Sequence, residues 1–210
     1  MATTTTNYGF DIPQSTDLVK DGATAIATLG QDIDTAMNTA LGTKKAGMVL
    51  LNTTSFSAVA SQSISDVFSA TYDNYRIILD VTSNVNTALS MRMRVAGSDN
   101  STSNYNVQYA SVDNTTLSAG RIATGTSWNM NGGQGTARCF YGLTLLNPFA
   151  TQFTGVYMEN SLRYDANLLA VGFQALGFAA TTSFTGFTLF PVGGASPTIS
   201  GTLSVYGFNK

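Results

Sequence analysis

The sequence predicts a mainly β protein, in which an N-terminal α-helix is followed by an antiparallel β-sandwich of jelly-roll-like topology. Residues 89–95 alternate strictly between apolar and polar side chains, a period of two that is typical of a half-buried strand. Similar short runs recur along the chain with turn-forming residues between them, which favours a sandwich. Only the first 45 residues differ, because their apolar residues recur at steps of three and four, as in a helix.

The predicted sandwich spans residues 46–210. Its strand candidates are apolar, β-branched or aromatic runs bounded by turns such as Gly97-Ser98-Asp99-Asn100 and Asn147-Pro148. The run at 168–180 is the most apolar of all and is interpreted as a buried strand pair. The candidates are residues 48–52, 64–68, 75–82, 89–95, 105–112, 137–146, 153–159, 168–177, 184–190 and 199–208.

The predicted helix runs from residue 17 to about residue 40, within an N-terminal part that spans residues 1–45. Glycine and alanine occupy several positions of its heptad seam, and each interior glycine costs about 1 kcal/mol relative to alanine, so the helix is marginal alone. It therefore packs either on identical helices of sister chains, which the narrow apolar stripe favours, or on its own β-domain. The seam consists of Val19, Gly22, Ile26, Leu29, Ile33, Ala36 and Ala40. The predicted oligomerisation residues are Val19, Ile26, Leu29, Ile33 and Ala36.

The composition argues against an enzyme. The 210 residues include a single cysteine, and only 10% are charged. They include no histidine, and this absence excludes both catalytic triads that use histidine and metal sites that use imidazole. Glu159 is the single glutamate, and its pairing with Asp165 is weak evidence for glycoside hydrolysis. We therefore expect no catalytic residues, no metal and no cofactor.

Charge and hydropathy also limit the partners. The net charge of −2 is too small for a nucleic-acid or anionic-membrane footprint. The longest apolar run is too short to span a bilayer, and the N-terminus lacks the pattern of a signal peptide. We expect neither nucleic-acid binding nor membrane insertion, and we expect Cys139 to be a small buried core residue.

The best candidate for receptor contact is the glycine- and amide-rich stretch 125–135, which holds the only tryptophan. Trp128 is predicted to stack on a sugar, while Asn129, Asn131 and Gln134 bond its hydroxyl groups. The alternative is that Trp128 anchors the stretch in the core. Tyr105 closes a second polar loop, 99–105, and is added to the receptor-binding candidates.

The opening residues 8–23 read YGFDIPQSTDLVKDGA and are followed by IATLG at 26–30. This opening resembles that of tailed-bacteriophage virion structural proteins of the tail-fibre type. Residues 72–77 (YDNYRI), 97–101 (GSDNS) and 205–210 (VYGFNK) resemble the C-terminal β-domains of the same proteins.

The resemblance implies a homotrimeric virion component that is made in the host cytoplasm. Its N-terminal segment, including Tyr8, Phe10, Ile12 and Pro13, would attach to other virion proteins such as a tail hub, an adaptor or the capsid. Its β-domain would face the host surface and its polysaccharide. Two roles stay open: a short trimeric tail fibre or tail receptor-binding protein, and a capsid decoration protein that stabilises the shell.

Overall fold

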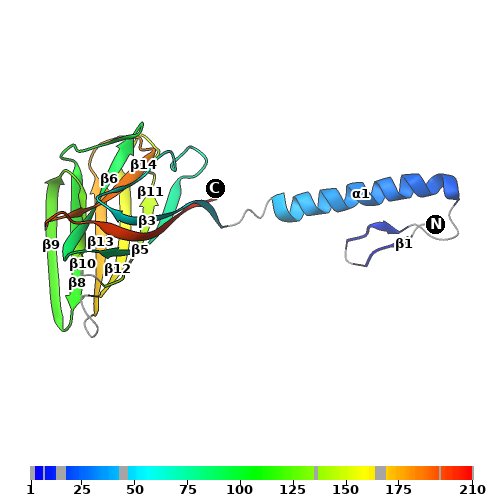
Figure 1. The fold of residues 1–210 in the computed structure, drawn as a ribbon. Helices are drawn as coiled ribbons and strands as arrows, with labels where there is room; N and C mark the ends of the chain where they lie inside the picture. The colour runs from blue at the N-terminus through cyan, green and yellow to red at the C-terminus, as the bar shows by residue number, and fades with distance from the viewer. Residues whose placement is uncertain are drawn as a thin grey trace. The chain divides into compact units, whose positions relative to one another are not determined.

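A computed structural model describes residues 3–6, 8–12, 18–42, 47–134, 137–163, 169–193 and 195–209. The chain divides into two compact units, Met1–Ala46 and Gly47–Lys210, close to the boundary predicted at residue 45. The second unit contains two antiparallel sheets, and the one described helix lies in the first (Figure 1). The predicted fold class, mainly β with an N-terminal helix before a sandwich-like domain, is confirmed.

The first unit combines a short hairpin with the helix. Strands β1 (Thr3–Thr4) and β2 (Asp11–Ile12) pair antiparallel, and α1 covers Val19–Gly42. The turn of the hairpin uses Gly9 at a φ of 67°, in the left-handed region that favours glycine. The backbone N–H of Gly9 donates to the carbonyl oxygen of Thr5 at 3.0 Å, and that of Phe10 donates to the Thr5 hydroxyl at 2.9 Å. The opening segment, which contains the predicted attachment residues, is therefore a closed hairpin.

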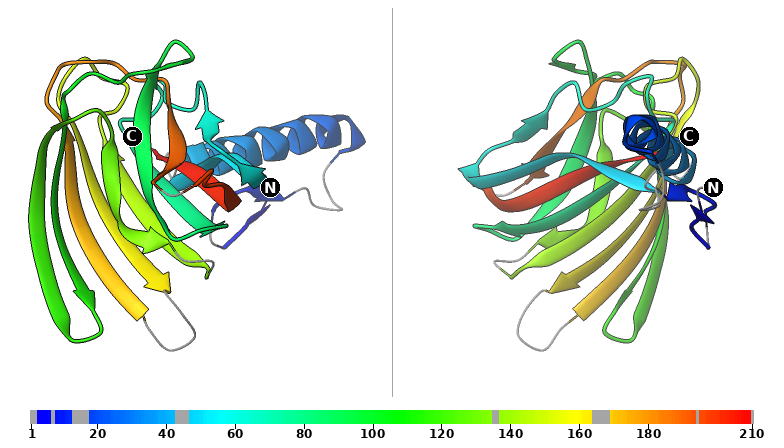
Figure 2. Two further views of the ribbon diagram at one scale, coloured as in Figure 1. Left: turned by 60° about the vertical axis from the view of Figure 1, so that its left-hand side comes forward. Right: turned by 90° about the vertical axis from the view of Figure 1, so that its right-hand side faces the viewer.

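The second unit, here called the β-domain, has one large and one small sheet (Figure 2). The large sheet has eight strands in the order β3-β15-β5-β11-β12-β13-β8-β9, and the small sheet has the order β10-β6-β14-β4 with β7 beside β6. The two sheets together contain more strands than a jelly roll, which has eight strands in two sheets. The bounds are β3 Met48–Val59, β4 Gln62–Ile64, β5 Asn74–Ser83, β6 Thr87–Val95, β7 Ser98–Asp99, β8 Tyr105–Asp113, β9 Thr116–Gly125, β10 Trp128–Gln134, β11 Cys139–Leu146, β12 Thr154–Arg163, β13 Leu169–Phe178, β14 Gly186–Val192 and β15 Ile199–Phe208.

Two of the longer strands lie where no strand was predicted. Strand β9 is an edge strand whose side chains are mostly exposed, so it lacks the apolar alternation of a half-buried strand. Strand β10 contains Gly132 and Gly133, and such a glycine pair favours a turn. In the structure both glycines lie within the strand, where the pairing with β6 shifts register between Asn129 and Gly133. The stretch predicted as a receptor loop is therefore largely a strand of the small sheet.

The run at 168–180 is also corrected. It was interpreted as a strand pair, but the described part is one strand, β13, whose side chains alternate between buried and exposed from Leu169 to Leu176. Its inward side chains, such as Ala170 and Leu176, join the core between the sheets. Its outward side chains are as apolar as the inward ones, so β13 has two apolar faces.

The core is built around edge-to-face aromatic contacts. The ring of Tyr105 lies 5.2 Å from that of Trp128 and 4.9 Å from that of Phe178, which in turn lies 4.9 Å from Phe184. All four rings are fully buried, and such pairs favour a T-shaped arrangement. Cys139 is buried and has a free thiol, as predicted, and burial raises the pKa of that thiol.

Candidate interaction surfaces

The predicted receptor residues Trp128 and Tyr105 do not face solvent. Both side chains are fully buried. The Trp128 indole N–H donates to the carbonyl oxygen of Gly177 at 2.9 Å, and the Tyr105 hydroxyl donates to the carbonyl oxygen of Asn100 at 2.6 Å. A ring in this position has no face free for a sugar, so the prediction that Trp128 stacks on a ligand is wrong and the core alternative holds. The same burial removes Tyr105 from the candidates.

The amide residues of the predicted receptor site all lie in strand β10. Asn129 is half-buried in β10 and engages in polar interactions within the protein. Asn131 and Gln134 lie in the same strand, but their side chains are outside the part that the structure describes. Without Trp128 and Tyr105 the described residues do not assemble the predicted sugar site.

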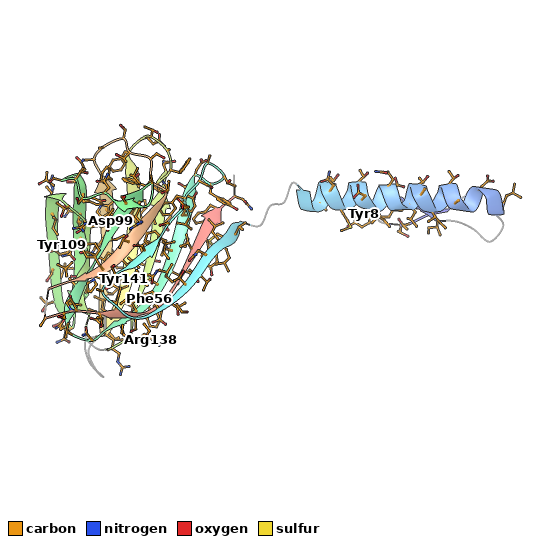
Figure 3. The ribbon with its side chains drawn as sticks, turned by 45° about the horizontal axis from the view of Figure 1, so that its top comes forward. Tyr8, Phe56, Asp99, Tyr109, Arg138 and Tyr141 are labelled. Carbon is orange, nitrogen blue, oxygen red and sulfur yellow. The ribbon has the colours of Figure 1, made fainter. Side chains whose placement is uncertain are left out.

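The predicted attachment residues instead meet the predicted helix seam. The rings of Tyr8 and Phe10 stack with their centroids 5.6 Å apart. Together with Ile33, Ala36, Met37 and Ala40 they line a hollow of about 230 Å³ between hairpin and helix, and Figure 3 shows Tyr8 beside α1. Ile12 is partly exposed on β2, and Pro13 lies outside the described residues.

The hairpin leaves the seam largely open. Ile26 is 65% exposed, Ile33 is 40% exposed, and none of the α1 side chains that the structure describes is buried. Leu29 and Ala36 are half-buried, while the side chain of Val19 is outside the described part. The first unit by itself thus contains an apolar stripe that the hairpin only partly covers.

The second exposed apolar surface lies on the large sheet, on the side opposite the core, and we call it the outer face. The strand register places its residues in rows that cross four or five strands. The first row is Tyr157, Ala175, Gln108 and Arg121. The second is Glu159, Phe173, Ala110 and Ala119. The third is Phe140, Ser161, Val171, Val112 and Leu117.

The large apolar side chains in these rows are strongly exposed. Tyr157 is 65% exposed, Phe173 61% and Leu117 71%. Phe140, Val171 and Val112 continue the patch on neighbouring strands and are also exposed. Single exposed apolar residues are ordinary, but a contiguous group in register marks an interaction site.

The outer face is hollowed between its aromatic side chains. Tyr157, Phe173, Gln108 and Glu159 are among the residues around a hollow of about 470 Å³, and alanines, including Ala175, form much of its remaining lining. A neighbouring hollow of about 220 Å³ shares Gln108 and Ala175 with it and is bordered by Phe153 and Arg121. Phe153 is 59% exposed and lies over Gly177, where an added Cβ would be 2.8 Å from the ring. The glycine thus leaves room for a third aromatic ring on this face.

Two ion pairs between described residues lie on the outer face. Arg76 on β5 forms an ion pair with Glu159 on β12 across Gly142 of the intervening strand β11. A Cβ at Gly142 would lie 2.6 Å from the Glu159 carboxylate, so only glycine leaves the pair undisturbed. Arg138 likewise contacts Asp80 at 2.8 Å.

Glu159 and the polar loop 99–105 are held by contacts within the β-domain. Glu159 is occupied by its ion pair with Arg76, and Asp165, its predicted partner, lies outside the described part. Within the described ranges no group of three or more acidic, histidine or cysteine side chains could hold a metal ion. In the polar loop 99–105, the Asp99 carboxylate accepts from Thr188 at 2.6 Å and pairs with Arg94 at 2.5 Å, which ties it to the small sheet.

The chain matches no protein-family model, and no curated protein sequence matches it. In the part of the chain that the structure describes, no helix has the length and apolar character needed to span a membrane.

Proposed function

We propose that the protein is a non-enzymatic structural component of a virion, a short trimeric tail fibre or tail receptor-binding protein that attaches by its N-terminal unit and displays its β-domain towards the host surface. The observation that supports this best is the pair of apolar surfaces, the open helix seam and the outer face, one in each unit. A part built from several copies needs such surfaces, whereas a monomeric enzyme needs a polar cleft with catalytic groups. The resemblance of residues 8–30 to virion proteins is the reason for proposing that the assembly belongs to a virion.

Attachment to the particle is assigned to the hairpin. Tyr8 and Phe10 present a stacked aromatic pair, and Tyr8 is 73% exposed, so the pair remains available to another virion protein. Deleting residues 1–14 should abolish incorporation into particles while the β-domain stays folded by circular dichroism. Truncated protein that still assembles onto virions would contradict this assignment.

Host-surface polysaccharide remains the proposed external partner, without the contribution first expected from Trp128. If the protein contacts the host, the purified full-length chain should reduce adsorption of the parent virus in a concentration-dependent way. Unchanged adsorption at saturating protein would remove host contact from the proposal.

The alternative role is capsid decoration, and the outer face is the observation that favours it, because an apolar face also suits a clamp between capsid subunits. Electron microscopy of particles labelled with an antibody to the β-domain separates the two roles. Label at the tail supports the fibre, and label spread over the head supports decoration.

A further inference from the structure

We propose that the outer face of the large sheet is a contact surface between copies of this chain, and that a second copy covers the hollow beside Tyr157 and Phe173. This inference rests on the proposed self-association, but it concerns the β-domain, whereas the predicted trimer contact concerns the helix. Four observations support a second copy as the occupant.

The first is the pattern of β13. Antiparallel strands with one solvated face alternate apolar and polar residues, and strands buried on both sides are apolar throughout. Leu169, Val171 and Phe173 point outward from β13 and are 66%, 42% and 61% exposed in the single chain. The sequence of β13 is therefore that of a strand covered on both sides.

The second is area. Taking about 200 Å² for a whole aromatic side chain, the exposed fractions of Tyr157, Phe173, Phe153 and Phe140 amount to roughly 450 to 500 Å². The aliphatic residues Val171, Val112 and Leu117 extend this patch in register. The total approaches the roughly 800 Å² that each partner buries in a standard protein interface.

The third is charge. Arg76 and Glu159 pair with each other, as do Arg138 and Asp80, so these charges need no charged partner from outside. A glycan would need hydrogen-bonding groups that are not already engaged, but Glu159 is paired with Arg76, and alanine and aromatic residues make up six of the ten residues that line the hollow. The face suits apolar protein surface better than sugar hydroxyl groups.

The fourth is local concentration. The β-domain starts at Met48, only a few residues after α1 ends at Gly42. Copies associated through their helices would hold their β-domains at an effective concentration on the order of millimolar. At that concentration even a weak contact between the β-domains forms.

The test uses a cysteine placed in the outer face of the full-length chain. Ser161 is exposed, between Phe140 and Val171 in the third row, and Ser98, exposed on β7, provides a matched control. The native thiol of Cys139 is buried and contributes little to the reaction. Labelling of Ser161→Cys and Ser98→Cys with a thiol reagent is followed in parallel with sedimentation velocity.

In the associated protein, Ser161→Cys should label at least about tenfold more slowly than Ser98→Cys, because the reagent reaches it only in dissociated copies. Adding the helix substitutions Ile26→Asp and Ile33→Asp should bring the two rates together. A further pair of variants places a lysine on each surface, Phe173→Lys on the outer face and Val192→Lys on the small sheet. Phe173→Lys should raise the dissociation constant of the oligomer by about tenfold or more, and Val192→Lys should leave it unchanged.

The possible failures are distinguishable. Equal labelling of Ser161→Cys and Ser98→Cys in a chain that sediments as an oligomer overturns the outer-face contact and leaves the proposed trimer standing. A chain that sediments as a monomer at every concentration overturns both. Protection of Ser161→Cys only in intact virions, or only after host polysaccharide is added, overturns the second copy and identifies another virion protein or a glycan as the occupant.

Discussion

Replacing Trp128 with phenylalanine tests the assignment of this residue to the core. The indole is fully buried, donates to the carbonyl oxygen of Gly177 at 2.9 Å and packs edge-to-face on Tyr105 at 5.2 Å. Phenylalanine keeps an aromatic ring but removes the donor and part of the ring.

The expected loss follows from these contacts. The lost hydrogen bond contributes about 0.5–1.5 kcal/mol, because the Gly177 carbonyl keeps its place in the ladder with Asn106 of β8, and the smaller ring removes roughly 1 kcal/mol more of burial. Trp128→Phe should therefore lower the free energy of unfolding by about 1.5–2.5 kcal/mol. In a domain of this size that corresponds to a fall in melting temperature of about 6 °C.

Urea unfolding followed by far-UV circular dichroism measures the loss, since the variant has no tryptophan fluorescence. Protein concentration is kept constant because self-association adds to apparent stability. Val192→Thr on the small sheet is the control, and because Val192 is 46% exposed and lies away from the outer face it should change stability by no more than about 0.5 kcal/mol. A Trp128→Phe variant as stable as this control, with impaired host binding, would refute the core assignment and restore the receptor role.

The remaining predictions concern the first unit and the response to pH. Ile26→Asp with Ile33→Asp should reduce the sedimenting mass, because carboxylates at exposed seam positions oppose helix association. Tyr8→Ala with Phe10→Ala should reduce incorporation into particles, measured by immunoblotting of purified virions, because it removes the stacked pair that the hairpin presents. Burial raises the pKa of Tyr105 from 10.0 to about 12. Its contribution to stability is therefore complete below pH 10 and is lost as the pH rises towards 12, and chemical denaturation across that range should show the decline.

Each of these has a contrary outcome. Unchanged mass in the double aspartate variant would show that the helix seam does not join copies. Full incorporation of the double alanine variant would move attachment elsewhere. A decline with pH that persists unchanged in Tyr105→Phe would assign it to other groups.

The sequence was sufficient for the fold class because the two periodicities are strong. The steps of three and four around Ile26 and Ile33 predicted α1, and the alternation at 89–95 predicted β6. Strand β9 was missed because an edge strand with little burial has no apolar alternation to detect. Strand β10 was missed because its glycines sit in a register shift and not in a turn.

The site was less predictable, because burial is a property of the fold. Trp128 and Met130 are both buried, and their spacing of two was the signal that the stretch is a strand. The apolar run at 168–180 was also a signal of the outer face, because it supplies the apolar outward side chains of β13. The sequence could not place Tyr157, Phe173 and Leu117 on one surface, since that depends on the register of β12, β13, β8 and β9.

The central claim is that this chain functions as an assembly of copies, and the mass of the purified full-length protein tests it most directly. Sedimentation velocity over a range of micromolar concentrations should show a species of three times the chain mass of 22.1 kDa. A single species with the mass of one chain throughout that range would contradict the account.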